Sequence, residues 1–259
     1  MKRLLQNLAV ALGLLALLLA GIRLWPHPPL SFGVPLSTAW YDRHGTLLRL
    51  SLASDDRYRQ WTPLEAISPL AVDGLLLHED RWFYYNPGVN PLSLARGFWR
   101  SYVLGGSRQG GSTITMQLAR MHWKLNTRSP GGKMVQVLRA IQLELSYSKH
   151  DILEAYLNAA PYGRNIESIG AASLIYFNKP PAQLTLAEAL TLAVLPQSPS
   201  LRMDPRSGEA SPPLMQARNR LFQRWQHAYP TDSSQQALFR LPLALRQPQN
   251  LPYIAPHFV

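Results

Sequence analysis

The sequence predicts a mainly α-helical protein with one small β-hairpin, preceded by a single transmembrane helix. Three observations support this fold class. Near the N-terminus, Lys2 and Arg3 precede fifteen residues without a charge, 8–22. Two short apolar segments then flank Asp42-Arg43-His44-Gly45, a turn signature typical of a hairpin. From Ser68 onward, helix-capping residues alternate with apolar residues at helical spacing.

The net charge and the absence of cysteine limit the kinds of ligand and metal site that we expect. Lys and Arg number 26 against 15 acidic residues, so the formal net charge of the 259-residue chain is +11. Such a surplus suits an anionic partner. The basic residues are scattered rather than gathered in a block, so we expect no nucleic-acid partner. The chain has no Cys, which excludes disulfides and thiolate metal sites and leaves the compartment open.

The N-terminal segment predicts the location. Residues 4–25 are about as long as a bilayer requires, and Trp25 suits the membrane interface. Because Lys2 and Arg3 should remain cytoplasmic, we expect the rest of the chain on the periplasmic side of the inner membrane, held by a single-pass anchor. A cleaved signal peptide is the alternative, but no small-x-small site follows cleanly, which favours an uncleaved anchor.

The expected domain organisation has four parts. They are a cytoplasmic tip and transmembrane anchor over 1–25, a Pro-rich stalk over 26–37, a globular domain over 38–241 and a Pro-rich linker start over 242–259.

The first elements of the globular domain follow from local signals. Trp40-Tyr41 and residues 47–50 should form the hairpin. Thr62-Pro63-Leu64-Glu65 has the pattern of a capping box that opens a short helix. Ser68 and Pro69 then suit the N-cap and first position of the next helix, whose apolar face would include Leu70, Leu76, Leu77 and Phe83.

Further helices are expected along the rest of the domain. They are one from Asn90-Pro91 to about 103, one from Ser112 or Thr113 to about 123, one to about 147 after a break at Pro130-Gly131-Gly132, one capped by Ser148-x-x-Asp151, one over 166–177 after a turn at Pro161-Tyr162-Gly163, one capped by Thr185-x-x-Glu188, and two near 213–228 and 231–240.

The chemistry is expected at the end of the helix that begins after Ser68. Glu79 closes an apolar helix, where desolvation can raise the pKa of a carboxyl and suit it to general-base work. The alternative is that Glu79, Asp80 and Arg81 form a solvated charge cluster. The segment Gly-Gly-Ser-Thr-Ile-Thr, 110–115, favours the first interpretation, because a flexible loop that leads into a capped helix can receive an anionic ligand.

Several motifs in register resemble one enzyme family. In chain order they are Glu79-Asp80-Arg81-Trp82-Phe83 continuing to Gly88, Gly110-Gly111-Ser112-Thr113-Ile114-Thr115-Met116-Gln117, Ile152-Leu153-Glu154-Ala155-Tyr156-Leu157-Asn158, Ala171-Ala172 with Tyr176-Phe177, Leu186-Ala187-Glu188-Ala189 and Leu195-Pro196-Gln197-Ser198-Pro199. Over roughly 38–205 the chain is identified as a member of the family 51 glycosyltransferases, and it resembles the N-terminal part of class A penicillin-binding proteins of the 1C type. Proteins of that type carry a transpeptidase domain after the polymerase, and we expect none here.

The resemblance implies a lysozyme-like helical domain and a reaction. A peptidoglycan glycosyltransferase transfers a growing glycan from a lipid-linked pyrophosphate to the sugar 4-hydroxyl of lipid II. Glu79 would be the base, and Asp80 would position it or its basic neighbours. The implied substrate-binding residues are Arg81, Phe83, Ser112, Thr113, Gln117, Lys133, Gln136, Arg139, Glu154 and Asn158. Ordinary roles compete: N-capping for Ser112 and Thr113, ion pairing for Arg81, and structural support for Glu154.

Three positions depart from the family pattern. Asn86 replaces a His, Met116 replaces the first Gln of a pair, and Gln136 replaces the carboxylate of the motif Arg-Lys-x-x-Glu, in which Lys133 is retained. A neutral residue at 136 predicts a weaker enzyme or one that depends less on a divalent ion. No cofactor is required, Mg²⁺ or Mn²⁺ is compatible with the chemistry, and no dedicated metal cage is recognisable.

Two other functions compete with this one. A lytic enzyme on a lysozyme-like scaffold would also use one glutamate, but the Gly-Gly-Ser-Thr motif and Lys133 favour synthesis. The three departures also fit a catalytically impaired, membrane-anchored scaffold for wall-synthesis proteins, against which Glu79 and Asp80 count. The expected partners are lipid II, the growing glycan chain, the membrane and cell-wall synthesis proteins.

Overall fold

The computed structural model describes residues 2–44, 47–91, 112–203 and 210–230, with isolated positions between 234 and 246. The chain forms two compact units, one of residues 1–32 with 84–152 and one of residues 33–83 with 153–259. The predicted helices to 103 and near 231–240 lie almost wholly outside the described residues, and so does the loop between 104 and 111.

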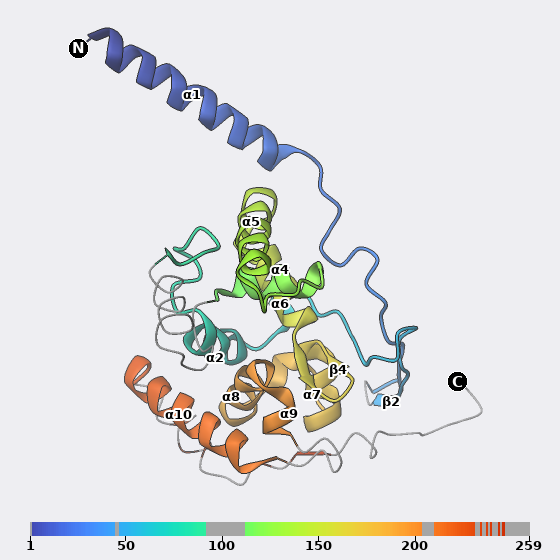
Figure 1. The fold of residues 1–259 in the computed structure, drawn as a ribbon. Helices are drawn as coiled ribbons and strands as arrows, with labels where there is room; N and C mark the ends of the chain where they lie inside the picture. Colours follow the sequence, from blue (N-terminus) through green and yellow to red (C-terminus); the bar gives the residue numbers. More distant parts are fainter. Residues whose placement is uncertain are drawn as a thin grey trace. The chain divides into compact units, whose positions relative to one another are not determined.

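The first unit contains four helices in its described part. They are α1 (Lys2–Leu24), α4 (Ile114–His122), α5 (Pro130–Ser146) and the first residues of α6 (Lys149–Ala159). The helix α4 packs against α5 (Figure 1). Arg23 at the end of α1 donates a hydrogen bond to the Glu144 carbonyl at 3.5 Å. In the described part of the chain, no helix combines the length and the apolar content needed to cross a membrane.

The N-terminal caps of α4 and α6 are formed by residues that the sequence pattern predicts. The Thr113 hydroxyl accepts a hydrogen bond from the Met116 amide and caps α4, as predicted. Ser148 and Asp151 form the expected reciprocal cap of α6, with 2.9 Å from the Ser148 amide to the carboxylate and 3.1 Å from the Asp151 amide to the hydroxyl. Both caps depend only on residues within one turn.

The predicted break at Pro130-Gly131-Gly132 is wrong. These residues form the first turn of α5, and the Ser129 hydroxyl caps it by accepting from the Gly132 amide at 3.1 Å. Proline is favourable at this position, because the first amides of a helix need no partner inside it. Glycine is needed at 132, since a Cβ there would lie 1.9 Å from the Asn126 carbonyl oxygen.

The second unit contains the predicted hairpin. Strand β1 (Ala39–Tyr41) pairs antiparallel with β2 (Leu47–Leu50), with Trp40 opposite Arg49. The remaining elements are η1 (Leu64–Ala66), α2 (Pro69–Glu79), β3 (Pro161–Gly163), β4 (Ile166–Glu167), α7 (Ile169–Phe177), η3 (Pro181–Gln183), α8 (Leu186–Val194), η4 (Leu195–Gln197), α9 (Pro199–Arg202) and α10 (Pro212–Ala228).

The core of this unit lies where α2 packs against α8 and α10 (Figure 1). Gly74 allows the close approach of α2 and α8, because a Cβ there would lie 2.8 Å from Leu190 Cδ2. The buried residues of α2 are Ala71, Gly74, Leu75 and Leu77. Leu77 and Phe83 are buried as predicted, but Leu70 and Leu76 are only half-buried, which corrects the predicted face.

Several predicted boundaries in the second unit also change. Ser68 is the N-cap residue of α2, but its hydroxyl donates to the Leu184 carbonyl instead of capping the helix. Thr62 makes no capping box, and η1 begins without a side-chain cap. The predicted turn at 161–163 is a strand of a second hairpin, so α7 begins at Ile169 rather than near 166.

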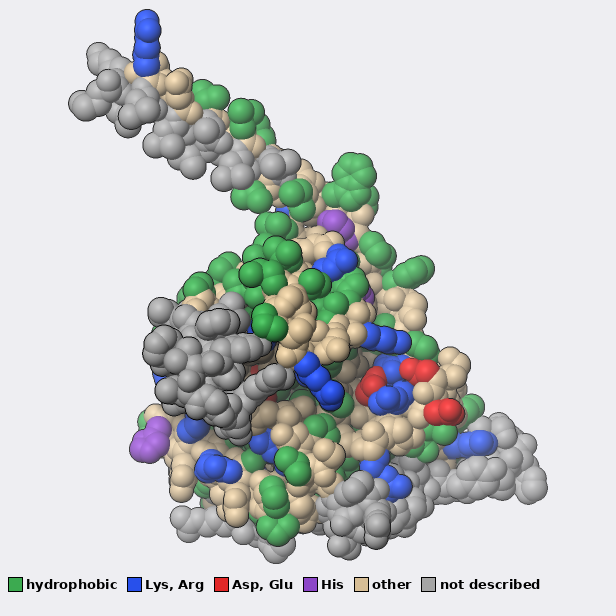
Figure 2. Space-filling view, in the orientation of Figure 1, with side chains coloured by type: hydrophobic (Ala, Val, Ile, Leu, Met, Phe, Trp, Pro, Cys, Tyr) green, Lys and Arg blue, Asp and Glu red, His purple; other side chains and the backbone are tan. Residues whose placement is uncertain are grey.

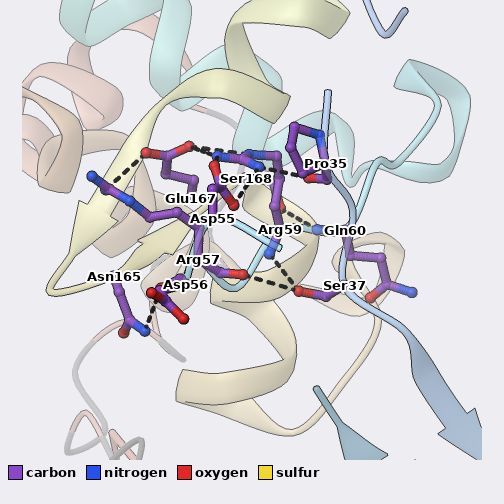
Figure 3. A network of polar contacts seen from close by, with 10 residues as sticks. All are labelled: Pro35, Ser37, Asp55, Asp56, Arg57, Arg59, Gln60, Asn165, Glu167 and Ser168. Atoms are coloured by element: carbon purple, nitrogen blue, oxygen red, sulfur yellow. Dashed lines mark hydrogen bonds and ion pairs between the residues drawn. The ribbon is translucent and has the colours of Figure 1, made fainter. Parts of the chain in front are cut away.

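A buried arginine fixes the start of the second unit (Figure 3). The Arg59 guanidinium donates to Glu167 from Nε at 3.0 Å, to Asp55 at 3.0 Å and to the Pro35 carbonyl at 2.6 Å. Ser37 also accepts from the Arg59 amide at 2.9 Å. Because Arg59 contacts both Pro35 and Glu167, it attaches the end of the predicted stalk to the second hairpin.

Candidate active site

The end of α2 determines the setting of Glu79. The helix ends at Asp80, whose φ of −157° is not helical and whose amide donates to the Leu76 carbonyl. A tight turn follows, since the Phe83 amide donates to the Asp80 carbonyl at 3.0 Å. The Glu79 side chain is only 7% exposed. Glu79 is therefore not part of a solvated charge cluster, although Arg81, which lies over the Trp82 ring, is exposed.

Cationic groups from distant segments lie near Glu79 within the second unit. His78 Nε2 is 3.6 Å from Glu79 Oε1. Burial and the positive charges of Arg202 and Arg224 lower the pKa of His78 to about 4, so the imidazole is neutral at pH 7. Arg202 donates to Gln197 Oε1 at 2.7 Å, and its charge interacts with that of Glu79. The Glu79 carboxylate thus faces one neutral imidazole and the field of nearby guanidinium groups.

Sequence reasoning missed Arg202 and Arg224. The Arg224 guanidinium donates to the Leu77 carbonyl near the end of α2. Arg202 follows the motif Leu195-Pro196-Gln197-Ser198-Pro199 by three residues, and that proximity is the available signal in the sequence. For Arg224 the sequence offers a weaker signal. It lies one helical turn after Arg220, and such pairs of basic residues are common on solvent-exposed helix faces.

In the first unit, Lys133 lies at the centre of a polar group. Its Nζ donates to Ser112 Oγ at 2.7 Å and to Gln136 Oε1 at 2.9 Å. Gln136 in turn donates from Nε2 to the Met116 carbonyl at 2.6 Å. Burial, together with the positive charge of Arg120, lowers the pKa of Lys133. Three predicted site residues, Ser112, Lys133 and Gln136, are therefore in direct contact.

Other predicted residues of the first unit have different settings. Thr113 is buried, and its hydroxyl both donates to the Gly88 carbonyl at 2.5 Å and accepts from Met116, so its hydrogen bonds are structural. Gln117 lies one turn further along α4 and is half-buried. Arg139 lies over the Trp123 ring, with its guanidinium carbon 4.8 Å from the centroid, and donates to Gln142.

Glu154 and Asn158 support the second unit. Glu154 accepts from Trp61 Nε1 and from the Leu64 amide, both at 2.9 Å. Asn158 is buried and bonds to both backbone groups of Thr62, at 2.8 Å each. All of these contacts attach the start of η1 and the two residues Trp61 and Thr62 before it to α6. The geometry is that of structural support rather than of groups open to a ligand.

The departure at Asn86 also has a local explanation. Its Oδ1 accepts from the Gly88 amide at 3.0 Å, and Gly88 has a φ of +83°, which glycine adopts without strain. The Asn86 carbonyl accepts from Lys149 at 2.7 Å. Asn86 thus stabilises the turn whose Gly88 carbonyl accepts from Thr113.

Comparisons with known proteins identify a single family. Residues 45–225 match the family model described as transglycosylase. Over 245 residues the chain is 40% identical to penicillin-binding protein 1C of Escherichia coli (strain K12), covering 91% of this chain and 30% of that protein. It is 41% identical over 122 residues to penicillin-binding protein 1F of Bacillus subtilis (strain 168), covering 47% and 17%. A crystal structure of penicillin-binding protein 1A from Haemophilus influenzae matches at a TM-score of 0.43 and 18% identity, covering 82% of this chain and 21% of that one.

The matched region includes candidate residues of both units. Glu79, Lys133 and Arg224 all lie within residues 45–225. The chain spans less than a third of the length of the two curated relatives.

Proposed function

Because the chain belongs to the transglycosylase family, we propose that it is a peptidoglycan glycosyltransferase that polymerises lipid II into glycan strands. In this reaction the bond between the sugar anomeric carbon and the pyrophosphate oxygen breaks. A β-1,4 bond forms to the 4-hydroxyl of the incoming lipid II, with inversion. The hydroxyl proton passes to a base, and polyprenyl pyrophosphate leaves as an anion.

The observation that carries this proposal is the burial of Glu79 at the end of α2. An attacking hydroxyl needs a base, because alkoxide is inaccessible at neutral pH. Glu79 supplies a carboxylate whose side chain is 7% exposed, within the region that matches the family model. Its neighbour Asp80 ends the helix and thereby sets the position of Glu79.

The leaving pyrophosphate requires positive charge rather than an acid, because it departs without a proton. Lys133 is assigned this role. Its ammonium group is held by Ser112 and Gln136, both of which are neutral. Unlike a glycosidase, which needs two carboxyl groups, this chemistry needs one carboxylate and one or more cations.

The proposed location is the inner membrane, with the catalytic part on the periplasmic side. It rests on the charge pattern around residues 2–25, since Lys2 and Arg3 precede an uncharged run. Figure 2 shows hydrophobic side chains gathered over α5. The exposed ones of this helix are Met134, Val135, Leu138 and Ile141. They share one helical face in the unit that contains α1, and a lipid surface is the occupant that suits them.

Such a location fits the substrate, because a polyprenyl tail stays in the bilayer. An enzyme tethered there meets lipid II and the growing glycan chain at high effective concentration. Other wall-synthesis proteins would be its neighbours. Alkaline carbonate extraction of membranes from expressing cells tests the location, and release of the full chain into the supernatant would contradict it.

The decisive experiment measures polymerisation of labelled lipid II by the detergent-solubilised chain and by Glu79→Gln. We expect polymer from the wild type and a loss of about a thousandfold in the variant, since general-base catalysis contributes that order of rate. Glu65→Gln is the matched control, because Glu65 is an exposed carboxylate. Full activity in Glu79→Gln would remove Glu79 as the base. No polymer from the wild type, with lipid II still bound, would favour the scaffold function.

A further inference from the structure

Gln136 uses both ends of its amide, one within α5 and one to reach α4. The side chain lies on α5 and the residue is 2% exposed. Oε1 accepts from Lys133 Nζ at 2.9 Å, and Nε2 donates to the Met116 carbonyl on α4 at 2.6 Å. Chemistry fixes this orientation, because a carbonyl can only accept and an ammonium group can only donate. A flipped amide would place like groups against each other at both ends.

In the described part of the chain, the contacts of Lys133 are with neutral groups. An ammonium group carries three protons, and Ser112 and Gln136 take two of them. Among the described residues Lys133 makes no ion pair with a carboxylate, and the charge of Arg120 adds to its own. Within the described residues, no carboxylate cancels the charge of Lys133, and two of its three N–H groups have acceptors.

We propose that Gln136 is a positioning residue for Lys133 and that it must be a neutral amide. It holds Nζ beside Ser112 without cancelling the charge of the ammonium group. The identity of the bound anion, the pyrophosphate of the leaving group, rests on the proposed function. The hydrogen-bonded arrangement itself is independent of that function.

A carboxylate at position 136 would be worse on two counts. It has no proton to donate, so one of its oxygens would face the Met116 carbonyl oxygen at 2.6 Å and repel it. Its negative charge would also pair with Lys133 and reduce the attraction for a phosphate. The residue that the related motif carries should thus impair this chain, whereas the sequence alone predicts that the missing acid weakens the enzyme.

The first test measures binding of inorganic pyrophosphate to the full chain in detergent by isothermal titration calorimetry. We expect Gln136→Glu and Gln136→Met each to weaken the affinity by about tenfold or more, because one cancels the charge and the other releases the lysine. Gln142→Glu is the matched control, since it adds the same charge to α5 at an exposed position that does not contact Lys133. It should change the affinity by less than twofold. Equal or tighter binding by Gln136→Glu would overturn the proposal.

The second test follows the titration of Lys133 itself. Trace acetylation at a series of pH values, read by mass spectrometry, gives the pH at which this amine becomes reactive. Gln136→Glu should raise that pH by about one unit or more, since an opposite charge favours the ammonium form. Gln136→Met should lower it, since the charged form loses a hydrogen bond.

The opposite signs distinguish positioning from a general loss of stability. Unshifted Lys133 profiles in both variants would overturn the proposal, even if both variants melt at lower temperature. Shifted profiles in a chain that makes no polymer would retain the role of Gln136 and reject the proposed function instead. The two conclusions are therefore tested separately.

Discussion

The surroundings of Glu79 and of Lys133 are built in opposite ways. Around Glu79 the relevant groups are charged or titratable and come from distant segments, since Arg202 and Arg224 are more than 120 residues away in the chain. Around Lys133 the partners are neutral and nearer in the sequence, because Gln136 lies on the same helix and Ser112 immediately precedes the Thr113 cap of α4. The Glu79 carboxylate is thus placed near cations by the tertiary fold of one unit, whereas the Lys133 ammonium group is held by neutral acceptors that are nearer in the sequence.

After the loss expected for Glu79→Gln, the next largest effect is expected when the charge of Lys133 is removed. Lys133→Met should lower kcat by about 10²–10³, the usual loss when one group that stabilises developing negative charge is removed. Steady-state polymerisation of lipid II measures it, with Lys124→Met, at an exposed position, as the control. If KM rises while kcat stays constant, Lys133 binds substrate and does not act on the leaving group.

The cationic surroundings of Glu79 should appear in the pH dependence of stability. The folded pKa of His78 is about 4, below the unfolded value of about 6.5. As the pH falls, the unfolded chain takes up the proton first, so stability present above pH 6.5 is lost between pH 6.5 and 4. The loss should reach about 3 kcal/mol.

Urea unfolding at a series of pH values checks this effect of His78. In His78→Gln the corresponding slope should disappear, while His227→Gln, at an exposed histidine, should keep it. An unchanged slope in His78→Gln would show that His78 is not the group that is held neutral.

The third prediction separates support from chemistry. Asn158→Ala leaves both backbone groups of Thr62 without their side-chain partner and should lower the free energy of unfolding by about 2 kcal/mol. Polymerisation per folded molecule should remain within about threefold of the wild type. Thermal unfolding and active-fraction measurements check both statements. A large loss of turnover at unchanged melting temperature would place Asn158 in contact with substrate.

The smallest effect is expected at Arg139. Its guanidinium lies over Trp123, so Arg139→Ala should cost about 0.5–1 kcal/mol of stability and change turnover by less than threefold. Parallel assays with Lys133→Met provide the comparison. A loss in Arg139→Ala as large as that in Lys133→Met would return Arg139 to the substrate-binding residues predicted from the sequence.

Several predictions that depend on contacts between residues close in the sequence agree with the structure, whereas a pairing between separate segments was missed. The caps at Thr113, at Ser148 with Asp151 and at Thr185 with Glu188 were predictable, because each involves residues within one turn. The break at Pro130-Gly131-Gly132 was mispredicted, because those residues also suit a first helical turn once Ser129 caps it. The second hairpin was missed, because its two strands are too short to show an alternating pattern in the sequence.

The sequence by itself determined the family, the position of Glu79 at the end of a helix and the retained Lys133, because motif order and helix periodicity are written along the chain. Only the tertiary structure decided what surrounds these groups. Packing of α2 against α8 and α10 sets the burial of Glu79. Packing of α4 against α5 brings the Met116 carbonyl within hydrogen-bond distance of Gln136. The burial of Glu79 and the contact of Gln136 with the Met116 carbonyl depend on packing between separate elements, and no local pattern encodes that packing.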